Sequence, residues 1–168
     1  AVVSLWSGSP DDDAGQTELD DRLVTGLRSV CDHARSRGAT IGFEPEPGMY
    51  IEDMAGFGRI QARMDQHPAF KLTLDLGHAH LTEAGPHAAA DTARAWIADI
   101  VNVHVEGMRR GLHDHLVPWE GDLDVLAAIR ALIASGYRGP ATYELSRHSH
   151  DAVRIASRAF ELAAPALG

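Results

Sequence analysis

Four side chains that can bind a metal ion recur at nearly even intervals along this sequence. Glu44, Asp75, His104 and Glu144 are 31, 29 and 40 residues apart, and each follows a short apolar run. Three carboxylates that lie close together repel one another unless a cation neutralises them. A set of three carboxylates and one imidazole suits Mn²⁺, Mg²⁺ or Co²⁺ and tolerates Zn²⁺. The four residues therefore predict a divalent-metal site, provided that the fold brings them together.

The segments around these residues alternate between strand-like and helix-like patterns. Apolar runs predict five strands, at residues 1–6, 40–43, 71–74, 100–103 and 140–143. Helical patterns follow them, at about residues 19–34, 54–66, 91–98, 123–134 and 150–163. This alternation favours an α/β fold with a parallel sheet. Functional groups gather at the carboxyl ends of such strands, so we expect the four residues to converge on one face.

Three histidines are candidates for a second set of ligands. His78 follows Asp75 by three residues and can face the same pocket. His113 and His115 alternate along the chain, so both point the same way if their segment is extended. Arg110 is a candidate for binding a substrate oxygen or phosphate, and a solvated loop charge is an equal alternative.

Other acidic residues are expected to cap helices or to lie at the surface. Thr17 with Asp20 resembles a capping box, and Asp53 is predicted to cap the helix that follows it. Glu46 and Glu106 fall just after strands and are expected at loop surfaces rather than in catalysis.

The composition limits which kinds of binding partner and which cellular compartment are expected. The net charge of −9 argues against a large nucleic-acid footprint. A single cysteine, Cys31, excludes a disulfide framework and fits a reducing cytoplasm. Apolar runs of membrane-spanning length and signal-peptide patterns are absent from the sequence, so no membrane partner is expected.

Several motifs resemble the xylose-isomerase-like TIM-barrel superfamily, which holds sugar phosphate isomerases/epimerases and endonuclease IV-type enzymes (AP endonuclease family 2). The matching segments are GFEPEPG, TLDLGHAH, VNVHVEGMRRG, HDHLVPWEGDLD and YELSRHSH. The resemblance implies a metal held by Glu44, Asp75, His104 and Glu144 at the ends of the fifth to eighth barrel strands. It also implies that Glu44 and Glu144 act as the acid/base pair, and that His78 and Arg110 bind substrate.

Two departures from the family pattern carry further expectations. Nuclease-like members have Asp-x-His where this chain has His113-Asp114-His115, so a second metal bound by His78, His113 and His115 is one possibility. Five strands match only the fourth to eighth of a (β/α)8 barrel. We therefore expect residues 1–168 to form a single incomplete TIM-barrel domain without its first three βα units. Either the chain is a C-terminal fragment, or upstream residues are missing, or another copy completes the barrel as a homo-oligomer.

The resemblance implies a metal-dependent isomerase or epimerase acting on a small sugar or sugar phosphate. Such an enzyme removes a proton beside a carbonyl group and passes through a metal-bound cis-enediolate. A multinuclear phosphoesterase that uses the added histidines is the first alternative. A non-catalytic barrel that acts as a partner in a biosynthetic complex is the second.

Overall fold

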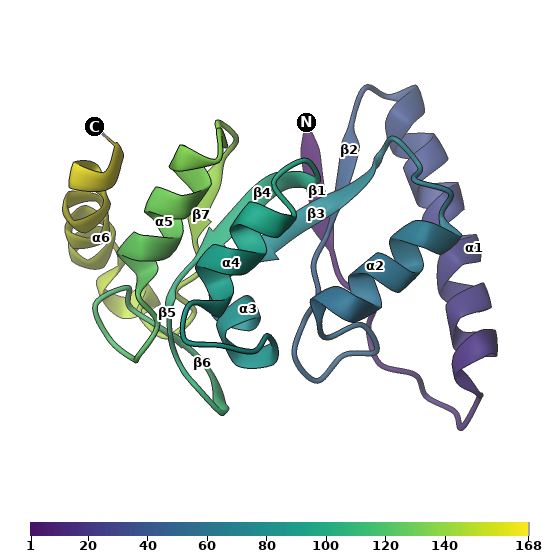
Figure 1. The fold of residues 1–168 in the computed structure, drawn as a ribbon, viewed down its shortest axis with the longest axis horizontal. Coiled ribbons are helices and arrows are strands. Elements are labelled where there is room, and N and C mark those ends of the chain that lie inside the picture. The colour runs from purple at the N-terminus through teal and green to yellow at the C-terminus, as the bar shows by residue number, and fades with distance from the viewer. Residues whose placement is uncertain (168) are drawn as a thin grey trace.

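Five parallel strands form one curled, open sheet in the computed structural model, which describes residues 1–167. Their order is β1 (Val2–Leu5), β2 (Thr40–Phe43), β3 (Phe70–Asp75), β4 (Ile100–Val105) and β7 (Ala141–Tyr143). Each strand pairs in parallel with the next, and β1 and β7 form the two edges (Figure 1). The predicted α/β fold is confirmed: the sheet is a half-barrel of the TIM type.

Helices connect the strands and lie side by side along the sheet (Figure 1). They are α1 (Gln16–Ser36), α2 (Met54–Arg63), α4 (Ala88–Ala95), α5 (Val125–Ala134) and α6 (Ala152–Leu167), with a short 3₁₀ turn at Ser149–Asp151. The predicted cap at Asp53 is confirmed, because its carboxylate accepts the backbone N–H of Gly56 at 2.7 Å. Asp124 caps α5 in the same way. Both caps satisfy helix-end donors that would otherwise lack partners.

Aromatic rings join the sheet to the helices that cover it. Phe43 on β2 and Phe70 on β3 lie 5.5 Å apart between ring centroids, and Phe57 on α2 stacks on Phe70 at the same distance. The rings of Trp96 and Phe57 form a T-shaped pair with their centroids 5.3 Å apart. All three phenylalanines are buried, and truncating such a ring to Ala typically costs about 3–5 kcal/mol. This cluster packs α2 against the end of β2, which precedes Glu44, and the start of β3.

Two elements lie in segments that the sequence patterns assign to loops. One is α3 (Leu76–Thr82), which starts immediately after β3 because the Asp75 side chain accepts the N–H of His78 at 2.8 Å. The other is a hairpin of β5 (Gly107–Arg109) and β6 (Leu112–Leu116), which turns at Gly111 with φ 81°. Both lie at the lower end of the sheet in Figure 1. Helix α4 also begins three residues before the predicted start.

The predicted capping box at Thr17 and Asp20 is wrong. Helix α1 begins after Gly15, with no side-chain cap. Asp20 is buried instead, where it accepts hydrogen bonds from Tyr50 and Arg59. Because α1 starts earlier than the pattern indicated, Asp20 lies within its second turn and faces α2.

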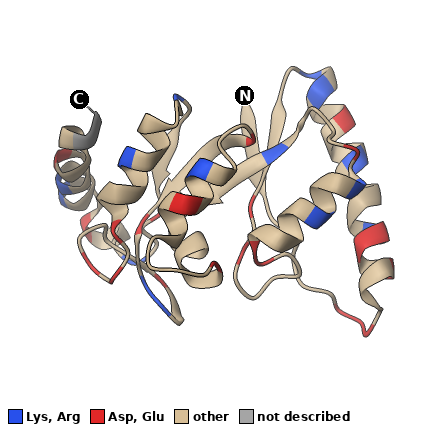
Figure 2. Ribbon diagram, in the orientation of Figure 1, with Lys and Arg blue, Asp and Glu red and all other residues tan. Residues whose placement is uncertain are grey.

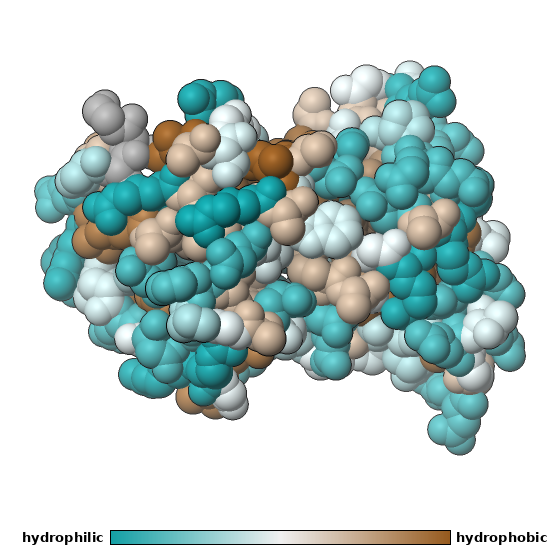
Figure 3. All heavy atoms as spheres, in the orientation of Figure 1, coloured by the Kyte–Doolittle hydropathy of each residue, from teal (hydrophilic) through white to brown (hydrophobic). Residues whose placement is uncertain are grey.

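The exposed surface is mixed in character. Figure 2 shows Lys and Arg on several helices, and Asp and Glu in loops at the lower end of the sheet. Apolar side chains are visible at the left of Figure 3, over α5 and α6. Among residues 1–167, no helix combines the length and apolar character needed to span a bilayer.

Candidate metal centre

The four evenly spaced residues meet at the carboxyl ends of the strands. Glu44 follows β2, Asp75 ends β3, His104 lies near the end of β4, and Glu144 follows β7. One potential ligand atom from each lies within 4.8 Å of the others, and we call these residues the strand-end cluster. The predicted convergence is therefore confirmed in the geometry. Their role as metal ligands stays a prediction.

His104 lies between the two glutamates of the strand-end cluster. Its Nδ1 is 2.9 Å from Oε1 of Glu44 and 2.8 Å from Oε2 of Glu144, while its Nε2 is 3.1 Å from the side-chain amide of Asn102. Burial opposes the charged ring, but the hydrogen bonds to Glu144 and Glu44 outweigh it and raise the pKa of His104 to about 10. The hydrogen bond from His104 also lowers the pKa of Glu144. Nδ1 is thus the nitrogen aimed at the position that a shared cation would take.

The hydrogen bonding of two buried carboxyl groups shows whether this site fits a cation. Oδ1 of Asp75 accepts the N–H of His78, but its Oδ2 is buried without a hydrogen-bond partner among the described residues. Oε1 of Glu106 is likewise buried without a hydrogen-bond partner among residues 1–167. Burial, reinforced for Glu106 by the charge of Asp75, raises the pKa of both groups. Unpartnered buried carboxylates of this kind are neutralised by a proton or a bound cation, so the donor set fits a divalent metal.

The expectation that Glu106 lies at a loop surface is wrong, since its side chain is fully buried. Strand β4 continues two residues beyond the predicted end, to Val105. Glu106 therefore follows His104 by two residues on an extended backbone and faces the same side. The same two-residue offset in the sequence could have identified Glu106, had the strand been extended.

His78, His113 and His115 form a second group, the histidine cluster, with ligand atoms within 4.8 Å of one another. The Nε2 atoms of His78 and His113 are 3.1 Å apart. The segment that carries His113 and His115 is strand β6, so the extended conformation that their alternation required is present. Burial lowers the pKa of His78 to about 4 and also lowers the pKa of His113, which keeps both rings in the neutral form that binds metals.

Glu46 is also part of this site rather than of a loop surface. Its carboxylate lies 3.5 Å from Nδ1 of His78 and 3.6 Å from Nε2 of His113. Burial and the neighbouring charge of Glu44 raise the pKa of Glu46 to about 7. Glu46 follows Glu44 by two residues, and this spacing was the available signal.

Arg110 takes a different position from the predicted substrate ligand. Its guanidinium donates to the backbone carbonyls of Glu83 at 3.3 Å and Gly85 at 2.9 Å. These bonds tie the hairpin to the loop that follows α3. The structure does not bring Arg110 to the strand-end cluster, and its contact with a substrate stays a prediction.

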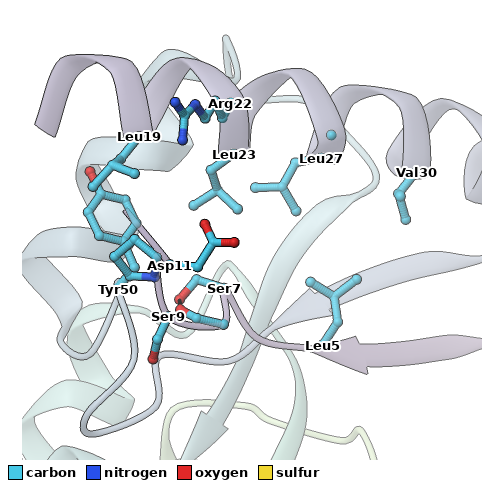
Figure 4. A pocket seen from close by; sticks show the side chains of 13 residues that line it. Leu5, Ser7, Ser9, Asp11, Leu19, Arg22, Leu23, Leu27, Val30 and Tyr50 are labelled. Atoms are coloured by element: carbon cyan, nitrogen blue, oxygen red, sulfur yellow. Dashed lines mark hydrogen bonds between the residues drawn. The ribbon is translucent and has the colours of Figure 1, made fainter. Parts of the chain in front are cut away.

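The larger grooves lie away from the metal-binding candidates. One groove of about 360 Å³ lies between α1 and the loop after β1, with Leu19, Leu23 and Leu27 along its helical wall (Figure 4). A second, of about 530 Å³, lies between α5, β7 and α6. Within residues 1–167, neither groove is lined by a residue of the strand-end cluster. The chemistry-bearing residues and the apolar grooves are therefore separate features.

The model of the family described as xylose isomerase-like TIM barrel matches residues 1–164. This chain belongs to that family. It is 27% identical over 150 residues to the 3-dehydroshikimate dehydratase of Pseudomonas putida, an alignment that covers 86% of this chain and 23% of the dehydratase.

Solved structures of other proteins share the fold. The IOLI protein with a bound zinc atom superposes with a TM-score of 0.76 at 18% identity, covering 98% of this chain and 63% of that protein. The D-allulose 3-epimerase of Methylomonas sp. in complex with D-allulose gives 0.69 at 21% identity, covering 92% and 57%. The chain thus spans about a quarter of the curated dehydratase and about three fifths of these structures.

Proposed function

We propose that this chain contributes the metal-binding and acid/base residues of an isomerase or epimerase that acts on a small sugar or sugar phosphate. The observation that carries the proposal is the meeting of Glu44, Asp75, His104 and Glu144 at one point of the sheet. The sugar epimerase among the structures of the same fold supports this substrate class. The zinc-bound relative supports a divalent metal, with Mn, Mg, Co and Zn as candidates.

Each residue of the strand-end cluster has a distinct part in this proposal. A bound divalent cation would neutralise the carboxylates and polarise the substrate carbonyl. Glu44 and Glu144 accept and return the proton on the carbon beside that carbonyl. Their side chains differ in exposure, 5% for Glu44 and 41% for Glu144, so Glu144 is the more accessible to substrate. Asp75 and His104 would hold the cation together with the two glutamates.

The dehydratase match favours dehydration as a second candidate reaction. Removing a proton beside a carbonyl is a first step that dehydration shares with epimerisation. The two reactions diverge when a hydroxyl group leaves the next carbon instead of the proton returning. The same strand-end cluster serves both reactions, and 27% identity over 86% of this chain is the observation that favours the second.

The histidine cluster supports a third candidate, a phosphoesterase with more than one metal. His78, His113 and His115 offer a second, nitrogen-rich site beside the strand-end cluster. A nitrogen-rich site prefers zinc over magnesium. Metal stoichiometry therefore separates this candidate from the first two.

Metal content and deuterium exchange together test the proposed function. Elemental analysis of protein purified without chelator is expected to give one divalent metal per chain, and Glu144→Gln to lower that content. With D-allulose in deuterated water, the wild-type protein should place deuterium beside the carbonyl, and Glu44→Gln and Glu144→Gln should slow this by about 10³-fold. Glu120→Gln, at a loop position outside both clusters, is the matched control.

Other outcomes decide among the candidates. Loss of water from 3-dehydroshikimate without exchange into sugars would replace the epimerase with the dehydratase. Two or three metals per chain with cleavage of a phosphodiester probe would favour the phosphoesterase. A folded protein that binds no divalent metal would contradict all three enzymatic candidates and favour the non-catalytic barrel.

A further inference from the structure

Glu106 connects the strand-end cluster to the histidine cluster. Its Oε2 is hydrogen-bonded to Nδ1 of His115 on β6. A carboxyl oxygen of Glu106 also lies within 4.8 Å of ligand atoms of Asp75 and His78. The side chain is fully buried, whereas His115 is 19% exposed. One immobile carboxyl group thus contacts or approaches members of both clusters.

The packing around Glu106 fixes the direction of its carboxyl group. A Cβ at Gly77 would lie 2.1 Å from Oε1 of Glu106 and 2.6 Å from the Cε atom of Met108. Only glycine leaves room for the carboxyl group at this point of α3. Glu106 therefore cannot rotate away from β6 without moving α3 or the hairpin, and Oε2 stays directed at His115.

We propose that Glu106 is a positioning residue that holds His115 in the tautomer with its proton on Nδ1. An imidazole that donates from one nitrogen keeps the lone pair of the other nitrogen free. With Nδ1 engaged by Glu106, Nε2 is the atom of His115 left to bind a ligand. His78 and His113 also approach each other through Nε2. Glu106 therefore leaves all three histidines with the same nitrogen, Nε2, directed to a shared ligand.

A carboxyl oxygen that accepts a hydrogen bond from an imidazole N–H orients the ring and strengthens the other nitrogen as a ligand. Without such an acceptor, the His115 ring would favour the opposite tautomer, with its proton on Nε2, as imidazole side chains do in water. The inference concerns the second ligand set considered under the proposed function, but the tautomer of His115 is measurable whatever reaction the protein catalyses.

Nitrogen-15 spectra of the histidine side chains in metal-free protein at alkaline pH test the inference directly. Wild-type His115 is expected to carry its proton on Nδ1. Glu106→Leu removes the acceptor and should shift His115 toward the Nε2–H form. Glu106→Gln retains an oxygen acceptor of the same reach and should keep the Nδ1–H form. Asp114→Asn is the matched control, because it neutralises a buried carboxylate of the same hairpin that pairs with Arg147 instead.

Gly77→Ala provides a second route if Glu106→Leu does not fold. The added methyl group displaces the Glu106 carboxyl group without removing it, so His115 should lose its tautomer preference as in Glu106→Leu. A folded Glu106→Leu or Gly77→Ala protein in which His115 stays entirely Nδ1–H would overturn the proposal.

Zinc titration of the same variants gives a separate measurement. We expect Glu106→Leu to weaken a second zinc ion by about 10- to 100-fold and to leave the first unchanged. Equal loss of both ions would overturn the positioning role, because it would show that Glu106 supports the whole site. If wild-type protein binds one zinc ion only, the phosphoesterase candidate fails, and the tautomer measurement still decides the role of Glu106.

Discussion

Asp20 and Asp75 are both buried carboxylates, but their surroundings differ completely. Asp20 accepts from the hydroxyl of Tyr50 at 2.6 Å and from Nε of Arg59 at 3.1 Å, and Arg63 lies 3.2 Å away. Each of its oxygens therefore has a cationic or polar partner supplied by the chain. Asp75 has one backbone donor, and its other oxygen has no partner in the described part of the chain.

The difference separates a buried charge that the chain itself offsets from one that it leaves without a counter-charge. Burying a charge costs free energy that only a fixed counter-charge or hydrogen bonds offset. Around Asp20 the offset is complete, so the carboxylate helps hold α1 against α2. Around Asp75 the nearest groups are further carboxylates and imidazoles. An arrangement of this kind is tolerated where a ligand supplies the missing charge.

Metal binding should produce the largest difference between substitutions at Asp20 and at Asp75. A divalent ion at about 100 times its dissociation constant stabilises a one-site protein by about 2.7 kcal/mol. We expect thermal unfolding to show this gain for wild-type protein and for Asp20→Asn, but not for Asp75→Asn. A gain of equal size in Asp75→Asn would show that the ion binds elsewhere.

Asp20→Asn should produce the next largest effect. Removing the carboxylate leaves Arg59 and Arg63 without their counter-charge, although both remain about one-third exposed and are partly solvated. We expect urea unfolding to show a loss of about 2 kcal/mol in the free energy of unfolding. A loss below 0.5 kcal/mol would mean that the Asp20 pairs contribute no more than ordinary surface ion pairs.

Asp75→Asn should have the opposite sign in metal-free protein. The amide has nearly the same shape and removes one negative charge from a group of buried carboxylates. We expect a gain of about 1 kcal/mol in the free energy of unfolding, measured with chelator present. Destabilisation of a folded Asp75→Asn protein would indicate that the charge of Asp75 has a structural partner, as that of Asp20 does.

The free energy of unfolding at acid pH should show the smallest effect. Burial opposes ionisation of Asp20, but hydrogen bonds from Tyr50 and Arg59 outweigh it and lower the pKa of this group. Its contribution is therefore complete above the unfolded pKa of about 3.9 and is lost as the pH falls through the lower folded value. Wild-type protein should lose this increment below about pH 4, and Asp20→Asn should not. A difference between the two that stays constant below pH 4 would contradict this assignment.

The alternation of strands and helices and the convergence of the strand-end cluster could be predicted because both follow from local patterns. Apolar runs of four to six residues indicate buried strands, and parallel connection places their carboxyl ends together. The spacing of Glu44, Asp75 and His104 by about one βα unit needs no knowledge of packing. Asp53 was predictable as a cap for the same reason, since its partner lies three residues away.

The two-residue spacing of Glu46 and Glu106 from strand-end residues indicates the side on which they lie, but the burial of Glu106 and of Asp20 depends on distant segments. Glu106 is covered by Gly77 on α3, about 30 residues earlier in the chain, and by β6, which reaches it when the hairpin folds back. Asp20 finds its partners about 30 to 40 residues away on the next βα unit. Arg110 likewise reaches a loop 25 residues earlier in the chain. Local periodicity carries no information about such contacts.

The order of the five parallel strands, the family resemblance and the four residues that close the strands follow from the sequence alone. Those features depend on side-chain type and on near neighbours along the chain. Which buried carboxylates have partners, and which lack one among the described residues, depends on the tertiary structure. Burial and counter-charge are properties of groups brought together across the fold, and they distinguish Asp75 from Asp20 although the two residues are chemically identical.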